Sequence, residues 1–175
     1  MRILTSVLIT IPTVIIGLIL YSHKRWVSTE EIREISKLHF WDQVFYATAA
    51  TFIGFNLINS LTIKLSGIES ASSTFEFQLP IIYIYSIIFS PLVEELICRK
   101  FLFKKLDSAI GFFPAALLSS ILFSVPHFDL QLTLGYIFIG MVWCFYYKRS
   151  NNILVPIVSH ACFNYITILI LSLKG

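Results

Sequence analysis

Long apolar runs recur along the chain, and they restrict what it can fold into more than any other feature. A helix of roughly 20 apolar residues is long enough to cross the hydrocarbon core of a bilayer. Hydrophobic residues make up 57% of the 175 residues and charged residues only 13%, whereas a soluble domain carries about a quarter charged residues. The sequence therefore predicts an integral membrane protein with the lipid bilayer as its surroundings.

The spacing of these runs predicts an all-α, polytopic membrane helix bundle of about six transmembrane helices. The predicted division is an N-terminal part, residues 1–78, with a signal anchor, a second span and an interfacial loop helix, followed by a catalytic membrane core, residues 79–175. The six expected helices cover about residues 3–21, 40–63, 79–106, 109–126, 130–147 and 153–173.

The first apolar run, Ile3 to Leu20, has no small-residue cleavage site, and its stronger basic cluster follows it. We therefore expect a retained signal anchor. In the loop that follows, Ser28 and Glu31 have the spacing of a capping box. They predict a short helix whose apolar face, with Ile32 and Ile35, lies in the membrane interface.

Basic residues are distributed unevenly between the two ends of the predicted spans. Ten of the 13 Lys and Arg residues fall at the first, third and fifth loops. The positive-inside rule then places the first loop in the cytoplasm. The net charge of only +3, carried in loops, argues against a nucleic-acid partner, and three cysteines within apolar runs argue against a disulfide framework.

A pair of carboxylates with an arginine, Glu94-Glu95-x-x-x-Arg99, interrupts one apolar run. A charge at mid-bilayer costs about 2.5–3.5 kcal/mol on insertion scales, so such residues usually face a cavity or each other. Glu95 and Arg99 are four residues apart with the acid first, which favours an ion pair on one helix face. Glu94 is turned about 100° away around the helix axis. The spacing predicts a tethered acid, Glu95, and a free acid, Glu94.

Two more polar pairs lie in later apolar runs. Phe123 and His127 are four residues apart, and so are His160 and Asn164, so each pair projects from one helix face. A single intramembrane histidine is more often a hydrogen-bond partner between helices than a catalyst. Two histidines, an asparagine and a glutamate pair in one half of the chain instead favour a site.

Depth along the helices gives a consistency check. At 1.5 Å per residue, Glu94 lies about 18 Å from the cytoplasmic end of its helix, and His160 and Asn164 lie roughly 11 and 17 Å from theirs. His127 lies about 27 Å from the start of its helix, which is too far unless that helix is tilted or begins within the membrane. Pro91, Pro126 and Pro156 precede the motifs, where proline bends helices or frees carbonyls.

Together these groups suit hydrolysis of an amide bond without a covalent intermediate. A free carboxylate beside a histidine can polarise a water molecule and take its proton. A second histidine and an asparagine amide can donate hydrogen bonds to an oxyanion. Phe123, one turn from His127, is placed to wall the site against lipid or to hold substrate.

The three motifs, in this order and spacing, resemble those of the CPBP family. That family contains the Rce1-type CAAX prenyl proteases and bacterial bacteriocin-processing and self-immunity proteins. The resemblance covers roughly residues 80–173 and implies an Rce1-like core and an intramembrane glutamyl endopeptidase in a bacterial cell membrane. Its substrate would be a membrane peptide or protein, prenylated (CAAX-type) or otherwise membrane-associated.

Residue by residue, the resemblance implies that Glu94 and His127 activate the water and that His160 and Asn164 form the oxyanion hole. It gives Glu95 and Arg99 a supporting role. Members commonly read Glu-Glu-x-x-Phe-Arg-Gly, whereas this chain has Cys98 and Lys100 in place of the phenylalanine and glycine.

Other mechanisms and functions remain as alternatives. Glu94, His127 and His160 could form a three-ligand zinc site, but adjacent acids beside an arginine suit a metal poorly, so we expect no cofactor. A serine protease is disfavoured because the chain has no Gly-x-Ser-x-Gly stretch, and Cys98 has no obvious base on its own face. A non-catalytic bacteriocin self-immunity or regulatory protein is the main alternative to an enzyme, and a proton-coupled carrier is the third.

Overall fold

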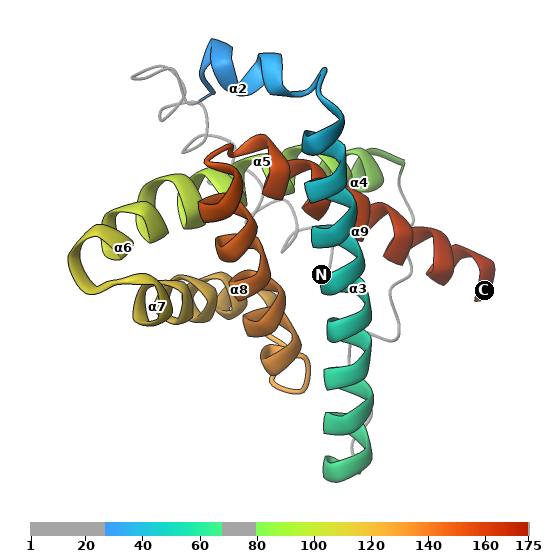
Figure 1. Ribbon diagram of the computed structural model, residues 1–175. Helices are drawn as coiled ribbons and strands as arrows, with labels where there is room; N and C mark the ends of the chain where they lie inside the picture. Colours follow the sequence, from blue (N-terminus) through green and yellow to red (C-terminus); the bar gives the residue numbers. More distant parts are fainter. Residues whose placement is uncertain (1–26, 68–79, 175) are drawn as a thin grey trace.

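The computed structural model describes residues 27–67 and 80–174, and this part of the chain is helical without any strand (Figure 1). Five of the six predicted helices have counterparts in it, while the predicted anchor over residues 3–21 lies outside the described residues. The elements are α2 (Thr29–Glu34), α3 (Leu38–Ser66), α4 (Pro80–Ile84), η2 (Tyr85–Phe89), α5 (Ser90–Glu95), η3 (Leu96–Phe103), α6 (Lys104–Ile110), α7 (Phe112–Ser124), η4 (Val125–His127), α8 (Thr133–Ser150) and α9 (Leu154–Lys174).

Helix α2 begins with the predicted capping box. The Glu31 amide donates to Ser28 Oγ at 3.1 Å, and the Ser28 amide donates to Glu31 Oε2 at 2.7 Å. Each side chain thus satisfies an amide that the first helical turn leaves without a partner. The apolar face predicted for this helix is exposed at Ile32 and Ile35, while its place in a membrane interface stays a prediction.

Helix α3 is the longest described helix and lies along one side of the others. Its buried face repeats every three or four residues, at Phe40, Val44, Ala47 and Thr51, as expected for a helix packed on one side. It packs against α8 and α9. The helix ends at Gly67, whose left-handed φ of 66° lets its amide reach back to the Ile63 carbonyl.

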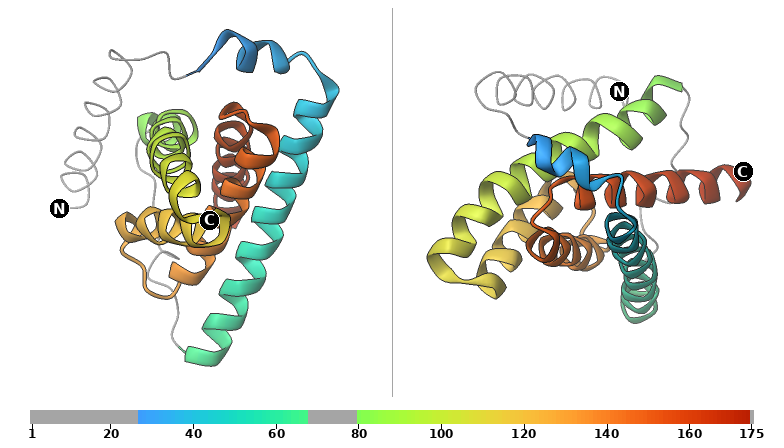
Figure 2. Two further views of the ribbon diagram at one scale, coloured as in Figure 1. Left: turned by 60° about the vertical axis from the view of Figure 1, so that its left-hand side comes forward. Right: turned by 45° about the horizontal axis from the view of Figure 1, so that its top comes forward.

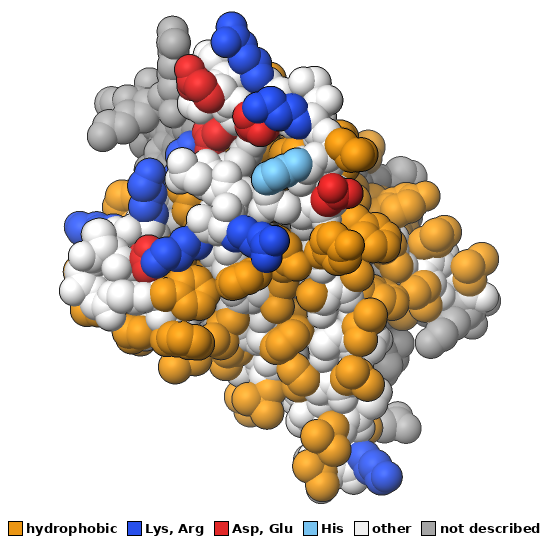
Figure 3. All heavy atoms as spheres, in the orientation of Figure 1, with side chains coloured by type: hydrophobic (Ala, Val, Ile, Leu, Met, Phe, Trp, Pro, Cys, Tyr) orange, Lys and Arg blue, Asp and Glu red, His pale blue; other side chains and the backbone are white. Residues whose placement is uncertain are grey.

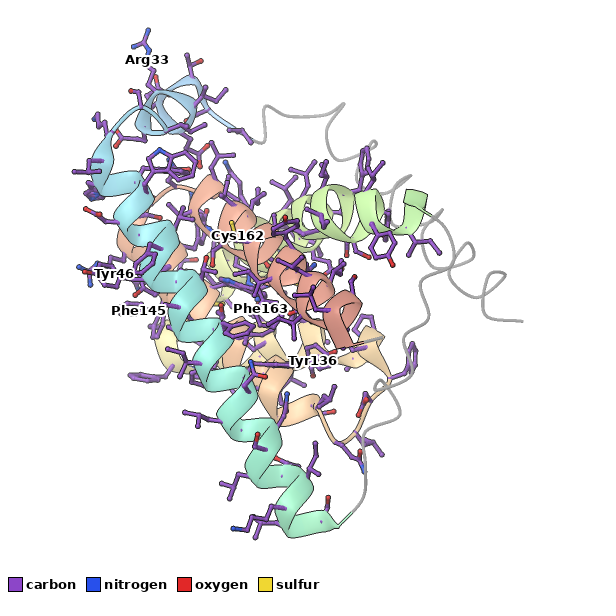
Figure 4. All side chains as sticks on the ribbon, turned by 90° about the vertical axis from the view of Figure 1, so that its right-hand side faces the viewer. Arg33, Tyr46, Tyr136, Phe145, Cys162 and Phe163 are labelled. Carbon is purple, nitrogen blue, oxygen red and sulfur yellow. The ribbon has the colours of Figure 1, made fainter. Side chains whose placement is uncertain are left out.

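Aromatic rings fill the space between α3 and the helices of the polar motifs. The Phe55 ring centroid lies 5.3 Å from that of Tyr136 on α8 and 5.3 Å from that of Phe163 on α9. Figure 4 shows Phe163 and Tyr136 on the inner side of α3, whereas Tyr46 and Phe145 point outward, where they are exposed. These contacts hold α3 against the side of the site.

The helix predicted over residues 79–106 is one continuous helical run from α4 to α6. Two stretches of this run, η2 and η3, have π-helical instead of α-helical hydrogen bonding. In the first, the Ser90 amide donates to the Tyr85 carbonyl, five residues earlier, instead of to Ser86. Pro91 follows directly and has no amide hydrogen to donate. The Ser86 carbonyl is therefore left without a backbone donor from Ser90 or Pro91, which matters for the site. Single π turns inside helices are frequent at functional sites.

Helix α7 and the 3-10 turn η4 carry Phe123 and His127. Figures 1 and 2 show α7 strongly inclined to α3 rather than parallel to it, and α9 also crosses α3 steeply. A tilt of this helix in the membrane is one of the two conditions under which the depth of His127 agrees with that of the other motif residues, and it stays a prediction. The predicted bundle is therefore helical as expected, but its helices cross at large angles.

Helices α7 and α8 approach closely because small residues meet where they cross. A Cβ atom added at Gly140 on α8 would lie 2.7 Å from Ser120 Oγ and 2.8 Å from Ser120 Cβ on α7. Small residues that let helix backbones approach are typical of membrane helix interfaces. The main core beside this crossing consists of Leu96, Phe103, Ala115, Ala116, Cys144, Tyr147, Ile153 and Ile157.

Apolar side chains are widely exposed on the described surface. Figure 3 shows them covering α3 below its first turns and much of α9, whereas charged side chains gather around α2 and the neighbouring helix ends. By length and composition, two described helices could cross a membrane, Leu38–Ser66 and Leu154–Leu173, and Phe112–His127 is a shorter apolar helix. The count of six spans and the orientation stay predictions.

Candidate active site

Five elements bring the motif residues together, and one of them is α7 with Phe123. Helix α5 contributes Glu94 and Glu95, the π-helical η3 contributes Arg99, and η4 contributes His127. Helix α9 faces them with His160 and Asn164. The contacts described below link six of the seven predicted residues directly to one another, and the seventh, Asn164, binds the same helical run that carries the two glutamates.

The centre of the site is a fully buried ion pair joined to a histidine. Glu95 and Arg99 are both 0% exposed, and Arg99 Nε lies 3.0 Å from Glu95 Oε2. The other carboxylate oxygen, Glu95 Oε1, lies 2.9 Å from Nδ1 of His160. Glu95 Oε1 therefore accepts a hydrogen bond from the N–H at Nδ1, and Nε2 of His160 is directed to the rest of the site. This is the environment expected for a tethered acid.

Aromatic rings surround the Arg99 guanidinium. Its central carbon lies 4.5 Å from the Phe123 ring centroid and 5.3 Å from that of Trp143, which are cation–π distances. Its Nη2 atom donates to the Gly140 carbonyl at 3.3 Å, while Nη1 is buried without a hydrogen-bond partner. The rings and the Glu95 carboxylate together compensate the charge of the buried guanidinium.

Glu94 has different surroundings from its neighbour. Its side chain is 28% exposed, and its Oε2 atom lies 3.9 Å from Nε2 of His160. The hydroxyl of Ser90, one turn earlier on the same helix, donates to Glu94 Oε1. The two adjacent carboxylates thus lie on opposite sides of one imidazole ring, Glu95 at Nδ1 and Glu94 near Nε2. Of the two, only Glu94 is accessible to a water molecule.

His127 is the second histidine of the site. Its Nδ1 atom lies 3.1 Å from the Phe123 carbonyl oxygen, so Nδ1 carries the proton in the neutral ring and Nε2 has the free lone pair. The Phe123 ring connects the two histidines, because its centroid lies 5.1 Å from that of His127 and 5.7 Å from that of His160. Tyr136 covers the outer face of His127 at a centroid distance of 3.9 Å.

Asn164 binds a backbone carbonyl of the π-helical stretch that lacks its usual helical donor. Its Nδ2 atom donates to the Ser86 carbonyl at 2.8 Å, the carbonyl to which neither Ser90 nor Pro91 donates an amide hydrogen. This bond fixes the orientation of the amide, and among the described residues no hydrogen bond uses its second N–H. The bond also ties α9 to the helical run of Glu94.

Trp143 is a site residue that the sequence motifs did not reveal. Its ring is fully buried and stacks on the His160 imidazole, with centroids 4.1 Å apart and planes 23° apart. Its indole Nε1 donates to Ser159 Oγ at 3.1 Å, and Ser159 also accepts from the Thr48 hydroxyl on α3. Trp143 has no motif partner at helical spacing, so only the three-dimensional contacts identify it. Ser90, by contrast, precedes Glu94 by one turn, and that spacing was visible in the sequence.

The alternatives to water activation can be compared with these contacts. Cys98 is a free, buried cysteine in an apolar cluster with Phe123, Trp143 and Phe163. This environment does not favour a nucleophilic thiolate. Within residues 27–67 and 80–174, no three His, Cys, Asp or Glu side chains form a group suited to a metal ion. Both oxygens of Glu95 are already engaged by Arg99 and His160.

The chain matches the model of a known family over residues 76–166, just over half of its length. That model describes type II CAAX prenyl endopeptidases that are Rce1-like. The chain belongs to the Rce1-like family. The matched stretch contains all seven predicted site residues, which confirms the resemblance drawn from the motifs and, with the apolar surface, identifies a membrane protein of this family.

Two curated relatives of this Rce1-like chain come from bacteria. One, named "Putative membrane peptidase YdiL" and from Bacillus subtilis, is 32% identical over 149 residues, covering 80% of this chain and 61% of the relative. Another, named "Membrane-embedded CAAX protease MroQ" and from Staphylococcus aureus, is 30% identical over 89 residues, covering 47% of this chain and 36% of the relative. The chain thus spans less than two thirds of either. No solved structure gave a significant match.

Proposed function

We propose that this Rce1-like chain is a multi-pass endopeptidase of a bacterial cell membrane that hydrolyses a peptide bond with water activated by Glu94 and His127. The observation that carries the proposal is the unequal placement of two adjacent carboxylates around His160. Glu95 is buried and bonded to Nδ1 at 2.9 Å, while Glu94 is accessible and lies 3.9 Å from Nε2. We therefore assign a structural role to Glu95 and the proton transfer to Glu94.

In the proposed reaction, a water molecule binds between the free oxygen of Glu94 and Nε2 of His127. Glu94 takes one proton as the water oxygen attacks the carbonyl carbon of the substrate, giving a tetrahedral oxyanion. When this intermediate collapses, Glu94 returns the proton to the leaving amine and the C–N bond breaks. The products are a carboxylic acid and an amine, and no covalent enzyme intermediate forms.

His160 and Asn164 are assigned to the oxyanion. A protonated His160, held by the Glu95 carboxylate at Nδ1, presents an N–H at Nε2, and Asn164 offers its second amide hydrogen. Donors fixed in place before the reaction stabilise developing charge more strongly in a water-poor site than in water. The stacked Trp143 ring and the bond to Ser86 provide that fixation.

The proposed substrate is a membrane-associated or prenylated peptide of the CAAX type, as the family description and the name of the Staphylococcus aureus relative suggest. The widely exposed apolar side chains of the described helices support a substrate that approaches through the bilayer. The proposed reaction uses no metal, because adjacent acids beside an arginine suit a metal poorly and Glu95 is held in the ion pair with Arg99.

The test is cleavage of a fluorogenic farnesylated C-terminal peptide, and of its unmodified form, by the purified full chain in lipid nanodiscs. Glu94→Gln should lower kcat by about 10²–10⁴-fold, the usual contribution of a general acid–base group. Treatment with EDTA or 1,10-phenanthroline should leave the wild-type rate unchanged. Full activity in Glu94→Gln would overturn the assignment, and inhibition by both chelators would favour a zinc mechanism. A biological phenotype that survives Glu94→Gln would favour the non-catalytic immunity or regulatory alternative.

A further inference from the structure

Glu31 lies outside the candidate active site, yet its carboxylate contacts η3 and the residue before α9, two elements that carry site residues. Besides closing the capping box of α2, Glu31 Oε2 lies 3.0 Å from Nζ of Lys100 on η3. Its Oε1 atom accepts the backbone amide of Ile153 at 3.0 Å, immediately before α9 begins. One side chain that is 11% exposed thus joins three elements that are far apart in the sequence.

The contact with α9 is a helix cap supplied by another element. The first amides of a helix have no partner within it and carry partial positive charge. Here Ile153 donates to Glu31, and the Leu154 amide donates to Asn152 Oδ1 at 2.9 Å. Asn152 in turn donates through Nδ2 to the Glu31 carbonyl at 3.0 Å. The start of α9 is therefore fixed by both the side chain and the backbone of Glu31.

The two anchor points lie close in sequence to the catalytic groups. Lys100 directly follows Arg99 and is five residues from Glu95, while Ile153 precedes His160 by seven residues, about two helical turns. Between these anchors lies the 2.9 Å contact of Glu95 with His160 and the 3.9 Å approach of Glu94 to the same ring. A displacement of α9 along α5, the helix of Glu94 and Glu95, would change both distances together.

We propose that Glu31 is a positioning residue for the active site, holding η3 at Lys100 and the start of α9 in the register that sets His160 between Glu94 and Glu95. This inference rests on the proposed peptidase function, and it assigns a role in that function to the helix α2 outside the family match. Misplacement of a reacting group by about 1 Å can cost on the order of 10²-fold in rate. Glu31 therefore acts on kcat through geometry and not through contact with substrate.

The experiment uses the full chain with Trp26 and Trp41 replaced by phenylalanine, so that Trp143 is the single emitter. Because Trp143 stacks on His160, its emission reports the arrangement of the site without any substrate. In this background we compare Glu31→Gln and Lys100→Met with two matched controls, Glu34→Gln and Lys104→Met. Glu34 is on the same helix but pairs with Lys37, and Lys104 is exposed one turn after Lys100.

Glu31→Gln and Lys100→Met should each change Trp143 emission and lower kcat for the farnesylated peptide about 10- to 100-fold, with KM nearly unchanged. Lys100→Arg, which keeps the charge pair, should restore both readouts, and the two controls should match the background protein. Unchanged emission and kcat in both Glu31→Gln and Lys100→Met would overturn the inference, as would an equal effect in Glu34→Gln.

The emission readout separates this inference from the proposed function. If the background protein cleaves neither peptide but Glu31→Gln still changes Trp143 emission relative to Glu34→Gln, the peptidase assignment fails and the positional role of Glu31 is supported. If the background protein cleaves the peptide and Glu31→Gln behaves identically to it, the function is supported and the positioning role is wrong. Lys100→Met provides the same comparison where Glu31→Gln does not fold.

Discussion

His160 Nδ1 lies 2.9 Å from Glu95 Oε1, and both side chains are buried. The opposite oxygen of Glu95 meets Arg99 at 3.0 Å, so one carboxylate neutralises a guanidinium and orients an imidazole at the same time. A histidine whose Nδ1 is held by a carboxylate has a fixed tautomer and ring orientation. Glu95 therefore supports the site in two ways, and its loss should differ from the loss of Glu94.

The first prediction contrasts the stabilities of Glu95→Gln and Glu94→Gln. Removing the charge of Glu95 leaves Arg99 buried without its counter-ion, which typically costs about 3–5 kcal/mol of folding stability. Glu94 is partly exposed, and its basic neighbour His160 Nε2 lies 3.9 Å away, so Glu94→Gln should change stability by less than about 1 kcal/mol. Thermal unfolding in detergent measures both. Equal destabilisation by the two substitutions would contradict the division between a structural and a reactive acid.

The second prediction concerns Trp143. Trp143→Phe keeps an aromatic ring against His160 but removes the hydrogen bond to Ser159, and it should lower kcat about fivefold, the effect of one net hydrogen bond. Trp143→Leu removes the stacked ring as well and should reduce both kcat and stability further. The pH profile of kcat distinguishes the two roles, since only loss of stacking on His160 should shift its limbs. An unaltered profile in Trp143→Leu would show that the ring serves packing alone.

Much of the local structure could be predicted from residue spacing. The Ser28–Glu31 capping box, the helices around the three motifs and the pairing of Glu95 with Arg99 all follow from contacts between residues three or four apart. Such contacts depend only on helix geometry. The family was recognisable for the same reason, because its motifs are short patterns of this kind.

Contacts between helices were not predictable in the same way. The stacking of Trp143 on His160 and the bond from Asn164 to Ser86 depend on how helices cross, which the spacing within one helix does not determine. The inclination of α7 and its close approach to α8 at Gly140 and Ser120 also depend on how the helices cross. The π-helical register before Pro91 was likewise hidden, although the proline signalled an irregular helix. The catalytic roles themselves stay predictions.

The third prediction tests the crossing of α7 and α8. A Cβ atom in Gly140→Ala would lie 2.7 Å from Ser120 Oγ and 2.8 Å from its Cβ, closer than real atoms approach. The helices must separate, and overpacking of this kind costs about 1–3 kcal/mol. The movement also displaces the Gly140 carbonyl from Arg99. Thermal unfolding should show the loss, and Ser120→Gly in the same chain should recover part of it, limited by the cost of a glycine within a helix.

The last prediction concerns pH and Glu31. Burial alone would raise the pKa of this carboxyl, but the amides of Ser28 and Ile153 and the ammonium of Lys100 outweigh burial and lower the pKa from its ordinary value of 4.5. A lowered pKa in the folded state means that the stabilisation is fully present above about pH 4.5 and is lost as the pH falls through the folded pKa. Glu30, Glu34 and Lys104 line the same polar cavity of about 400 Å³, but the charged group that lowers the pKa of Glu31 is Lys100. At pH 7, Glu31→Gln should lower Tm by about 5 °C, as expected when hydrogen bonds to a charged group are weakened. That difference from wild type should shrink below pH 4.5, because protonation removes the same charge in the wild-type protein.

Thermal unfolding from pH 3.5 to 7 measures the difference in Tm between Glu31→Gln and wild type, with Glu34→Gln as the control for general acid effects. A constant difference across this range would show that the charge of Glu31 contributes nothing beyond its shape.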